Sequence, residues 1–350
     1  MRLNASLANE MTEKGFIPDS LIRRGIRKLL TSRLDEIAAD NAELMACNQD
    51  LFIQHMKDSG VALVPEKANE QHYEVPEAFF QTVLGYRLKY SCGYWDDEVE
   101  NIHQSEERAL QISCEHAEIE NGMQILELGC GWGSLTFWMA EHYPDSHIVA
   151  VSNSTSQGDF IRAEADKKGL TNIEIVTADM NDFAPSRQFD RVVSVEMFEH
   201  MRNYEVLYKR ISSWLKPEGK FFKHIFVNRS APFSFEDRDD TVCLSRHFFS
   251  GGMMPSDDLP LFFQKDLSIE KRWRWSGQHY EKTSNAWLAR MDANKQELWA
   301  LFESVYGKDF APLWWRRWRV FFMACAELFG YDNGQQWWVS HYLFSKRQVG

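Results

Sequence analysis

Two glutamates and a histidine, Glu196, Glu199 and His200, lie close together in the sequence. They come directly after an apolar stretch, residues 189–195, that predicts a buried strand. If Glu196 begins a helical turn, the i, i+3 and i+4 spacing places the three side chains on one face. Such a group can hold a cation and remove a proton from it, and burial beside a like charge raises the pKa of a carboxyl group. The alternative interpretation is that the glutamates cap a helix or form surface ion pairs.

A glycine cluster in residues 125–140, ILELGCGWGSLTFWMA, is the second feature that carries chemistry. Gly129, Gly131 and Gly133 permit a sharp turn between a strand and a helix, and they allow backbone to approach a ligand closely. Dinucleotide-binding enzymes share this pattern. Here, however, Glu127 precedes the loop, and the strand that follows about 20 residues later runs into Val151-Ser152-Asn153-Ser154, which offers no acidic residue for a ribose diol.

The elements that must position these residues alternate between strands and helices. Short apolar stretches predict strands at residues 123–128, 148–151, 173–177, 189–195, 220–227 and 337–345. Helices are predicted between them at residues 135–142 and 204–215. This order indicates an α/β fold with a mostly parallel sheet that is covered on both faces. Helical periodicity also predicts N-terminal helices within residues 1–65 and later helices at residues 284–306 and 313–329.

The glycine cluster resembles a known motif. ELGCGWG, residues 127–133, is similar to the first motif of the class I methyltransferases, which use S-adenosylmethionine, and Ala178-Asp179-Met180 matches the place where they hold the adenine amine. Several further segments resemble the cyclopropane fatty acid synthase superfamily: residues 71–76 (QHYEVP), 90–95 (YSCGYW) and 195–200 (VEMFEH), with Ser152-Asn153-Ser154 and Gln157. The N-terminal region and residues 325–334 and 340–344 are most similar to the coclaurine N-methyltransferase branch.

The resemblance implies a Rossmann-like methyltransferase sheet whose last strand is antiparallel, with a helical insertion before that strand. It divides the chain into an N-terminal helical region that closes over the cofactor (1–110), a cofactor-binding core (111–229), a helical insertion or lid for the acceptor (230–332) and the final strand (333–350). Within the insertion, residues 229–260 are rich in Ser, Asp, Gly and Pro and predict a long excursion.

The resemblance also assigns site residues. Those expected at the cofactor are Tyr90, Ser91, Glu127, Gly129, Cys130, Gly131, Asn153, Gln157, Asp179 and Met180. Glu196, Glu199 and His200 agree with the catalytic Glu, Glu and His of the coclaurine branch. Cys325 matches a cysteine proposed as a nucleophile in the lipid enzymes, although its apolar helical surroundings favour packing.

Two acceptors fit the resemblance, a small aromatic or alkaloid-like amine and the acyl chain of an unsaturated phospholipid. The lipid enzymes of the superfamily use bound bicarbonate as their base, and its ligands correspond to Cys92, Glu199, His224 and Tyr280. Their position equivalent to Glu196 is usually glycine, so this chain combines both patterns. Glu196 and the acidic net charge favour the amine; Tyr280 and Cys92-Gly93-Tyr94-Trp95 favour the lipid.

Composition and charge argue against several kinds of partner and site. A net charge of −12 argues against nucleic acid, and no apolar run is long enough to span a bilayer. The six cysteines lack metal-ligand or disulfide spacing, so we expect no metal and reduced thiols in a cytoplasmic enzyme. A homodimer is compatible with these features.

Overall fold

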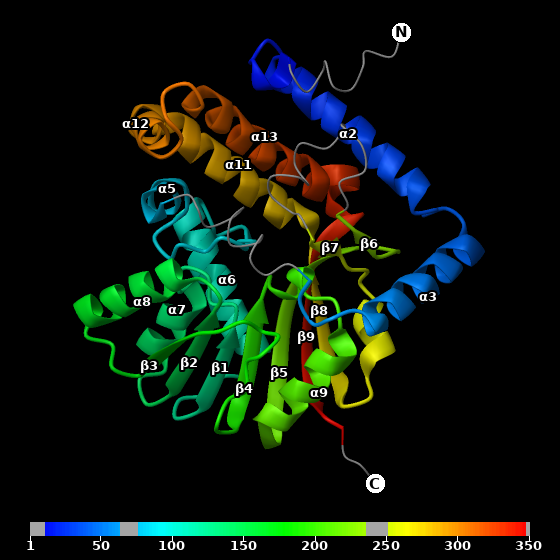
Figure 1. The fold of residues 1–350 in the computed structure, drawn as a ribbon, viewed down its shortest axis with the longest axis vertical. Coiled ribbons are helices and arrows are strands. Elements are labelled where there is room, and N and C mark those ends of the chain that lie inside the picture. The colour runs from blue at the N-terminus through cyan, green and yellow to red at the C-terminus, as the bar shows by residue number, and fades with distance from the viewer. Residues whose placement is uncertain (1–10, 64–75, 236–250, 348–350) are drawn as a thin grey trace.

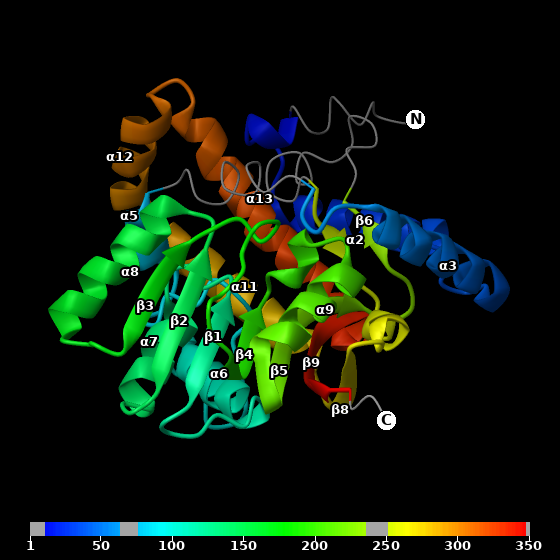
Figure 2. The same ribbon diagram turned by 60° about the horizontal axis from the view of Figure 1, so that its bottom comes forward.

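The computed structural model describes residues 11–63, 76–235 and 251–347. Its centre is a seven-stranded sheet in the order β3-β2-β1-β4-β5-β9-β8. The strands are β1 (Gln124–Leu128), β2 (His147–Ser152), β3 (Ile173–Thr177), β4 (Phe189–Val195), β5 (Leu215–Asn228), β8 (Leu267–Trp275) and β9 (Trp337–Lys346). Figure 2 shows them side by side from β3 at one edge to β8 at the other.

The strands pair as expected for the predicted α/β fold class. Strands β1 to β5 pair in parallel, whereas β9 runs antiparallel to both of its neighbours, β5 and β8. The expectation of a mostly parallel methyltransferase-type sheet with an antiparallel last strand is confirmed. Because the carboxyl ends of the parallel strands share one edge, residues that follow β1, β2 and β4 lie close together there.

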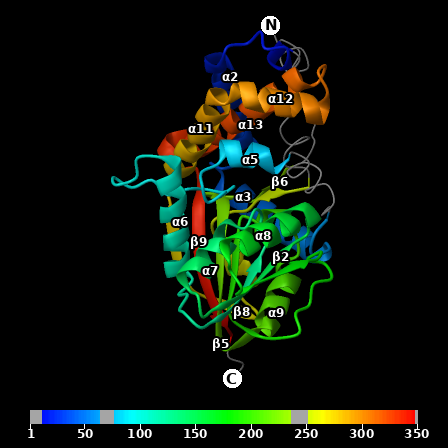
Figure 3. The same cartoon turned by 90° about the vertical axis from the view of Figure 1, so that its left-hand side faces the viewer.

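Two layers of helices cover the sheet because side chains alternate along each strand. Phe222 and Phe226 of β5 belong to one buried apolar cluster, and Phe221 and Ile225 belong to the other. The first cluster includes side chains of α6 (Ile102–His116), α7 (Ser134–His142) and α8 (Thr155–Lys168), and the second includes those of α3 (Ala42–Asp58) and α9 (Tyr204–Trp214). In Figure 3, α6 and α9 lie on opposite sides of the strands.

A group of helices lies over the carboxyl edge of the sheet (Figure 1). It consists of α2 (Asp19–Glu36), α5 (Glu77–Val83), α11 (Gly277–Ala293), α12 (Lys295–Tyr306) and α13 (Ala311–Gly330). The N-terminal α2 packs against α13, with an ion pair of 2.9 Å between Arg23 and Glu327. Segments from both ends of the chain therefore form one cover above the glycine cluster.

Strand β8 was not expected from the sequence. It lies within residues 230–332, the part interpreted as a helical insertion, yet it forms the edge of the core sheet beside β9. The strand carries Glu270, Lys271, Arg272 and Arg274, so it lacks the apolar pattern of a buried strand; charged side chains are typical of an exposed sheet edge. Strand β5 also begins earlier than predicted, because residues 216–219, which lie between the predicted helix and the predicted strand, continue the strand through a register shift.

Two predicted segments fall partly or wholly outside the described residues. Of the excursion at residues 229–260, residues 236–250 lie outside; what is described includes a short antiparallel pair, β6 (Phe233–Ser234) with β7 (Met253–Met254). Residues 71–75, part of the QHYEVP segment quoted for the family resemblance, also lie outside.

The start of α11 offers a test of this packing. A Cβ atom added at Gly277 would lie 2.2 Å from the carbonyl oxygens of Phe329 and Trp337, which are backbone atoms that cannot move aside easily. Gly277→Ala is therefore expected to lower the free energy of unfolding by about 1–3 kcal/mol. The matched control is Gly25→Ala in α2, where a Cβ meets nothing within 4 Å, and which should gain up to about 1 kcal/mol. Urea unfolding of the two variants measures both; equal effects would contradict the packing.

Candidate active site

The glycine cluster forms a tight loop between β1 and α7. Gly129, Gly131 and Gly133 have φ values of 81°, 53° and 82°, in the left-handed region that favours glycine. The backbone N–H groups of Gly129 and Cys130 both donate to the carbonyl oxygen of Val151, which fastens the loop to β2. At Gly131 an added Cβ would meet nothing within 4 Å, so the space beside this residue is open to a ligand.

Buried polar atoms around the loop lack protein partners. Among the described residues, Trp132 Nε1, Ser134 Oγ and Gln157 Nε2 are buried without a hydrogen-bond partner. Gln157 lies in the first turn of α8, which follows β2. Its Oε1 accepts from Ser152 Oγ at 2.8 Å, and this bond fixes the direction of the unpartnered amide nitrogen. Unsatisfied buried polar groups are costly, and a polar ligand at the loop removes that cost. The residues present therefore fit a polar cofactor bound at the loop.

The other residues expected at the cofactor surround the same edge of the sheet. Asp179 and Met180 follow β3, and Asp179 Oδ1 accepts from the N–H of Asn181 at 2.7 Å. Asn153 follows β2 and is exposed. Glu127 is buried in β1 and accepts from Thr136 Oγ1 at 2.5 Å, and burial raises the pKa of its carboxyl group to about 7. Glu127 thus ties β1 to α7 beneath the loop.

The segment around Tyr90 is held in place by a buried carboxylate. Glu106 of α6 accepts from the backbone N–H groups of Gly85, Arg87 and Lys89 at 2.8, 2.9 and 3.3 Å. Lys89 is 2% exposed, and its Nζ donates to Ser91 Oγ at 2.6 Å and to the Cys92 carbonyl oxygen at 2.7 Å. Burial lowers the pKa of Lys89, and the carboxylate of Glu196 opposes that shift.

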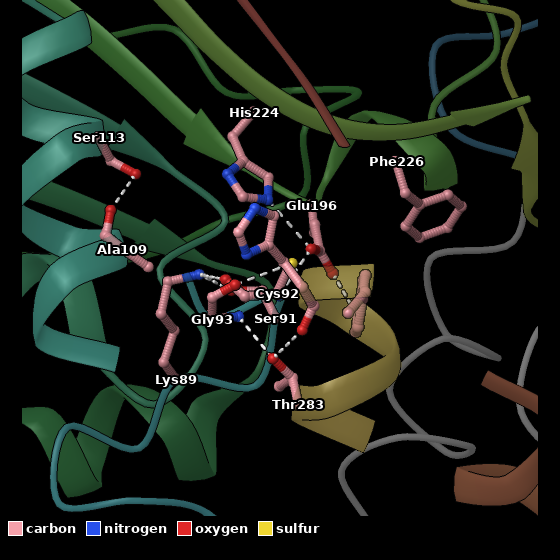
Figure 4. Close-up of polar contacts among 12 residues, drawn as sticks. Lys89, Ser91, Cys92, Gly93, Ala109, Ser113, Glu196, His224, Phe226 and Thr283 are labelled. Carbon is pink, nitrogen blue, oxygen red and sulfur yellow. Dashed lines mark hydrogen bonds and ion pairs between the residues drawn. The ribbon is translucent and has the colours of Figure 1, made fainter. Parts of the chain in front are cut away.

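Helix α11 holds the next part of the same segment. Thr283 Oγ1 accepts from the N–H of Gly93 at 3.1 Å and from Trp95 Nε1 at 2.9 Å (Figure 4 labels Gly93 and Thr283). Aromatic rings continue from α5 to α11: the ring centroids of Phe80 and Tyr90 are 5.1 Å apart, and those of Tyr90 and Trp287 are 5.6 Å apart. Phe80 also packs on Trp132 of the glycine loop, at 5.2 Å. The loop and the insertion are thus joined by aromatic contacts.

The carboxylate of Glu196 is the point where three parts of the chain meet (Figure 4). Its Oε1 accepts from the backbone N–H of Cys92 at 3.0 Å and contacts His224 Nε2 at 3.1 Å, and its Oε2 accepts from Tyr280 OH at 2.7 Å. The side chain is only 9% exposed. Burial raises the pKa of Glu196, while Lys89 acts in the opposite direction.

The backbone at Glu196 contradicts the predicted helical turn. Glu196 has a φ of 48°, and the short 3-10 helix η1 begins only at Phe198 and ends at His200. Glu196, Glu199 and His200 therefore do not share one helical face by their spacing. The left-handed residue reverses the chain directly after β4 and directs the Glu196 side chain to Cys92, His224 and Tyr280 instead.

Glu199 and His200 are close to Glu196 but differ in environment. Glu199 is 1% exposed; its Oε1 accepts from the N–H of Phe226 at 2.9 Å, and its Oε2 has no partner among the described residues. Burial, and secondly the charge of Glu196, raise the pKa of Glu199 well above the ordinary value. Burial lowers the pKa of His200 to about 4, so the imidazole is neutral at neutral pH.

Sequence reasoning missed a second buried lysine beneath this group. Lys223 of β5 is fully buried, and its Nζ donates to Tyr208 OH at 2.7 Å. Five aromatic rings lie within 6 Å of the amine, those of Phe198, Tyr204, Tyr208, Tyr342 and Phe344. Burial lowers the pKa of Lys223 to about 7, and Glu199 opposes the shift.

The thiols of Cys92, Cys130 and Cys325 are poor nucleophiles, because their surroundings disfavour the thiolate. Burial raises the pKa of the Cys92, Cys130 and Cys325 thiols, and Glu196 or Glu127 raises it further. Cys92 reaches Glu196 through its backbone N–H, whereas its thiol lies 3.1 Å from the Gly93 carbonyl oxygen. Among the described residues, no group of three or more His, Cys, Asp or Glu is arranged to hold a metal ion. In the same part of the chain, none of the helices is long and apolar enough to cross a membrane.

The strand order, the left-handed glycine loop and the polar groups around it define a class I S-adenosylmethionine-dependent methyltransferase. The sequence model of mycolic acid cyclopropane synthetase matches residues 64–338, and the chain belongs to that family. S-Adenosylmethionine is its cofactor.

Relatives and solved structures agree with this membership. The chain is 34% identical to (S)-coclaurine N-methyltransferase of Thalictrum flavum subsp. glaucum over 96% of this chain and 94% of the relative. It is 29% identical to cyclopropane-fatty-acyl-phospholipid synthase of Escherichia coli K12 over 77% of this chain and 66% of that enzyme. A crystal structure of coclaurine N-methyltransferase, bound to N-methylheliamine and S-adenosylhomocysteine, superposes with a TM-score of 0.93 at 33% identity and covers 96% of this chain and 98% of the other.

The glycine loop provides a test of cofactor binding. Gly131→Ala places a methyl group in the open space beside the loop, and it should weaken S-adenosylhomocysteine binding at least about tenfold, or about 1.4 kcal/mol. Gly169→Ala is the matched control, because Gly169 also has a positive φ, 69°, and open space, but it caps α8 at the opposite end from Gln157. Calorimetry would contradict the assignment if the two variants lost affinity equally.

Proposed function

We propose that this methyltransferase transfers a methyl group to the nitrogen of a small aromatic amine of the alkaloid type. The observation that carries the proposal is the set of contacts of the Glu196 carboxylate. The backbone N–H of Cys92, His224 Nε2 and Tyr280 OH all meet it. These are three of the four residues that, by resemblance, correspond to bicarbonate ligands in the lipid enzymes. A carboxylate of the chain itself takes up the interactions that those enzymes would use for a bound anion.

The relatives support an amine as the acceptor. Two of them, 34% and 32% identical over 96% of this chain, are (S)-coclaurine N-methyltransferase and pavine N-methyltransferase from Thalictrum flavum subsp. glaucum. The residues that had favoured a lipid, Cys92 and Tyr280, are engaged by Glu196. They therefore do not argue for methylene transfer to an acyl chain.

The chemistry follows from the ionisation of the site. When bound at the glycine loop, S-adenosylmethionine supplies an electrophilic methyl group. An amine that arrives as an ammonium ion must first lose a proton, since its nitrogen lone pair is the nucleophile. Glu196 suits this step, because its raised pKa makes it a stronger base than an ordinary carboxylate. The ammonium of Lys89 lies near enough to favour the ionised form that accepts the proton.

Glu199 and His200 have distinct roles in the proposal. The buried Oε2 of Glu199, which lacks a partner in the described structure, can hold an N–H of the acceptor. Neutral His200 can contact the amine without adding a positive charge beside it. The aromatic rings of Phe80, Tyr90 and Trp287 exclude water and can contact a cation through their faces.

The first test is the substitution Glu196→Gln. Turnover with a panel of secondary aromatic amines, followed by mass spectrometry with methyl-labelled cofactor, should fall more than about tenfold, since positioned proton transfer contributes roughly 10²–10⁴-fold. S-Adenosylhomocysteine affinity should remain, because the glycine loop is a separate surface. Glu297→Gln, on the exposed side of α12, is the control that should keep full activity. Methylenation of unsaturated phospholipid vesicles that requires bicarbonate and survives Glu196→Gln would overturn the proposal.

The pH dependence gives an independent test. A raised pKa means that Glu196 is protonated, and inactive as a base, up to a higher pH than an ordinary glutamate. Turnover of the wild-type enzyme should therefore rise with pH through an acid limb above the ordinary carboxyl range. In Glu196→Gln this limb should vanish, and activity should recover only at alkaline pH, where solution deprotonates the amine. An acid limb that is unchanged in the variant would exclude Glu196 as the base.

A further inference from the structure

A row of three histidines leads from Glu196 along one face of the sheet to the end of α6. His224 of β5 contacts Glu196 Oε1 through Nε2, at 3.1 Å, and its Nδ1 lies 2.8 Å from Nε2 of His341 on β9. The Nδ1 of His341 lies 2.8 Å from Nδ1 of His116, the last residue of α6. His224 and His341 are fully buried, whereas His116 is partly exposed and stacks on Trp273 with 3.9 Å between centroids.

The surroundings keep the three rings neutral. Burial lowers the pKa of His224 and His341 well below the ordinary value, and it lowers the pKa of His116 to about 4. The cations that face the row act in the same direction: Lys89 at the inner end and Lys271 of β8 at the outer end. The groups that face Glu196 itself are Lys89, His200, Tyr280, Cys92, Glu199 and Cys325.

Neutrality forces the hydrogen bonds to share one direction. A neutral imidazole has one N–H and one acceptor nitrogen, and both nitrogens of His224 and of His341 are engaged in the row. If His224 donates to Glu196, it must accept from His341, which in turn must accept from His116. All three N–H groups then point toward the carboxylate. The only other complete arrangement has all three pointing away from it, which requires that Glu196 is protonated and donates to His224 Nε2.

We propose that this row of histidines couples the protonation of Glu196 to the solvent on the α6–β8 side of the sheet, through a joint change of tautomer in all three rings. A proton added at Nε2 of His116 lets one proton pass along each of the three hydrogen bonds. The product is protonated Glu196 with every ring neutral and in the opposite tautomer. Loss of a proton from Nε2 of His116 reverses the passage and restores the carboxylate.

The row supplies protons to, and removes them from, the base of the proposed reaction. Its role in catalysis therefore rests on the proposed function, whereas the experiment below does not. Glu196 is nearly buried, and the acceptor must lie against it for proton transfer. The row gives the carboxylate an exchange with solvent that does not cross the acceptor side. His224 then positions Glu196 and reports its protonation state, and His341 and His116 act through His224.

The experiment is nuclear magnetic resonance of the full-length protein with 15N-labelled histidine and bound S-adenosylhomocysteine. Two-bond proton–nitrogen correlations identify the protonated nitrogen of each ring, and single His→Gln variants assign the signals. Between about pH 4 and pH 8 we expect His224, His341 and His116 to exchange tautomers together, with one apparent pKa. His142, which stacks on Trp138 outside the row, is the internal control, and its signals should not follow the joint exchange.

Two variants separate this coupling from simple packing. In Glu196→Gln the group that drives the change is removed, so the joint exchange should disappear while the protein stays folded. In His116→Phe an aromatic ring is still present to stack on Trp273. The arrangement in which the N–H groups point away from Glu196 would, however, leave the Nδ1–H of His341 without an acceptor. The apparent pKa of the change in His224 and His341 should therefore fall by at least about half a unit.

Independent titration of the three rings to imidazolium, or a joint exchange that persists unchanged in Glu196→Gln, would overturn the inference. Neither outcome depends on methyl transfer. If the rings exchange together but no amine is methylated, the proposed function fails and the coupling stands. If amines are methylated by Glu196 while the rings titrate separately, the coupling alone fails.

Discussion

The burial of the Glu196 carboxylate is the constraint on which the rest of the site depends. A charged carboxylate in an apolar interior is costly unless hydrogen-bond donors and a counter-charge surround it. Here one donor is the backbone of Cys92, a second is His224 of the central sheet, and a third is Tyr280 of α11. Because these come from the N-terminal part, the core and the insertion, satisfying one carboxylate fixes three parts of the chain relative to one another.

Two buried lysines on opposite faces of the sheet supply positive charge to Glu196 and Glu199. Lys89 lies on the same side as Glu196, and Lys223 lies among aromatic rings on the other side, beneath Glu199. Each has a pKa lowered by burial and partly restored by the glutamate it faces. The two carboxyl groups thus have separate counter-charges, and each lysine opposes the rise that burial causes in the pKa of the glutamate it faces.

The mixed family pattern of the sequence has a simple structural explanation. Residues that resemble bicarbonate ligands and residues that resemble an amine methyltransferase seemed to point to different acceptors. In the structure they form one group, because the Glu196 carboxylate reaches the donors that surround it. By the resemblance, the lipid enzymes usually have Gly at the position after β4 where this chain has Glu196.

Much of the fold and part of the site could be predicted from the sequence alone. The glycine loop and the strands from β1 to β5 and β9 follow from local patterns, because loop geometry and buried strands depend on neighbouring residues. Glu196, Glu199 and His200 were selected by their spacing after a predicted strand, whereas His224 and Tyr280 came only from the family resemblance. The joint placement of these side chains did not follow from spacing. The positive φ at Glu196 reverses the chain, and a helical turn assumed from i, i+3 and i+4 cannot anticipate that.

Only the tertiary structure decided the rest. Lys89, Lys223, His116 and His341 lie far apart in sequence from the glutamates they influence, and their chemistry depends on burial, which no local pattern reports. Strand β8 is charged because it is an edge, so its place beside β9 is visible only once the sheet is assembled. Cys92 acts through its N–H rather than its thiol, and a backbone contact has no signature in the sequence at all.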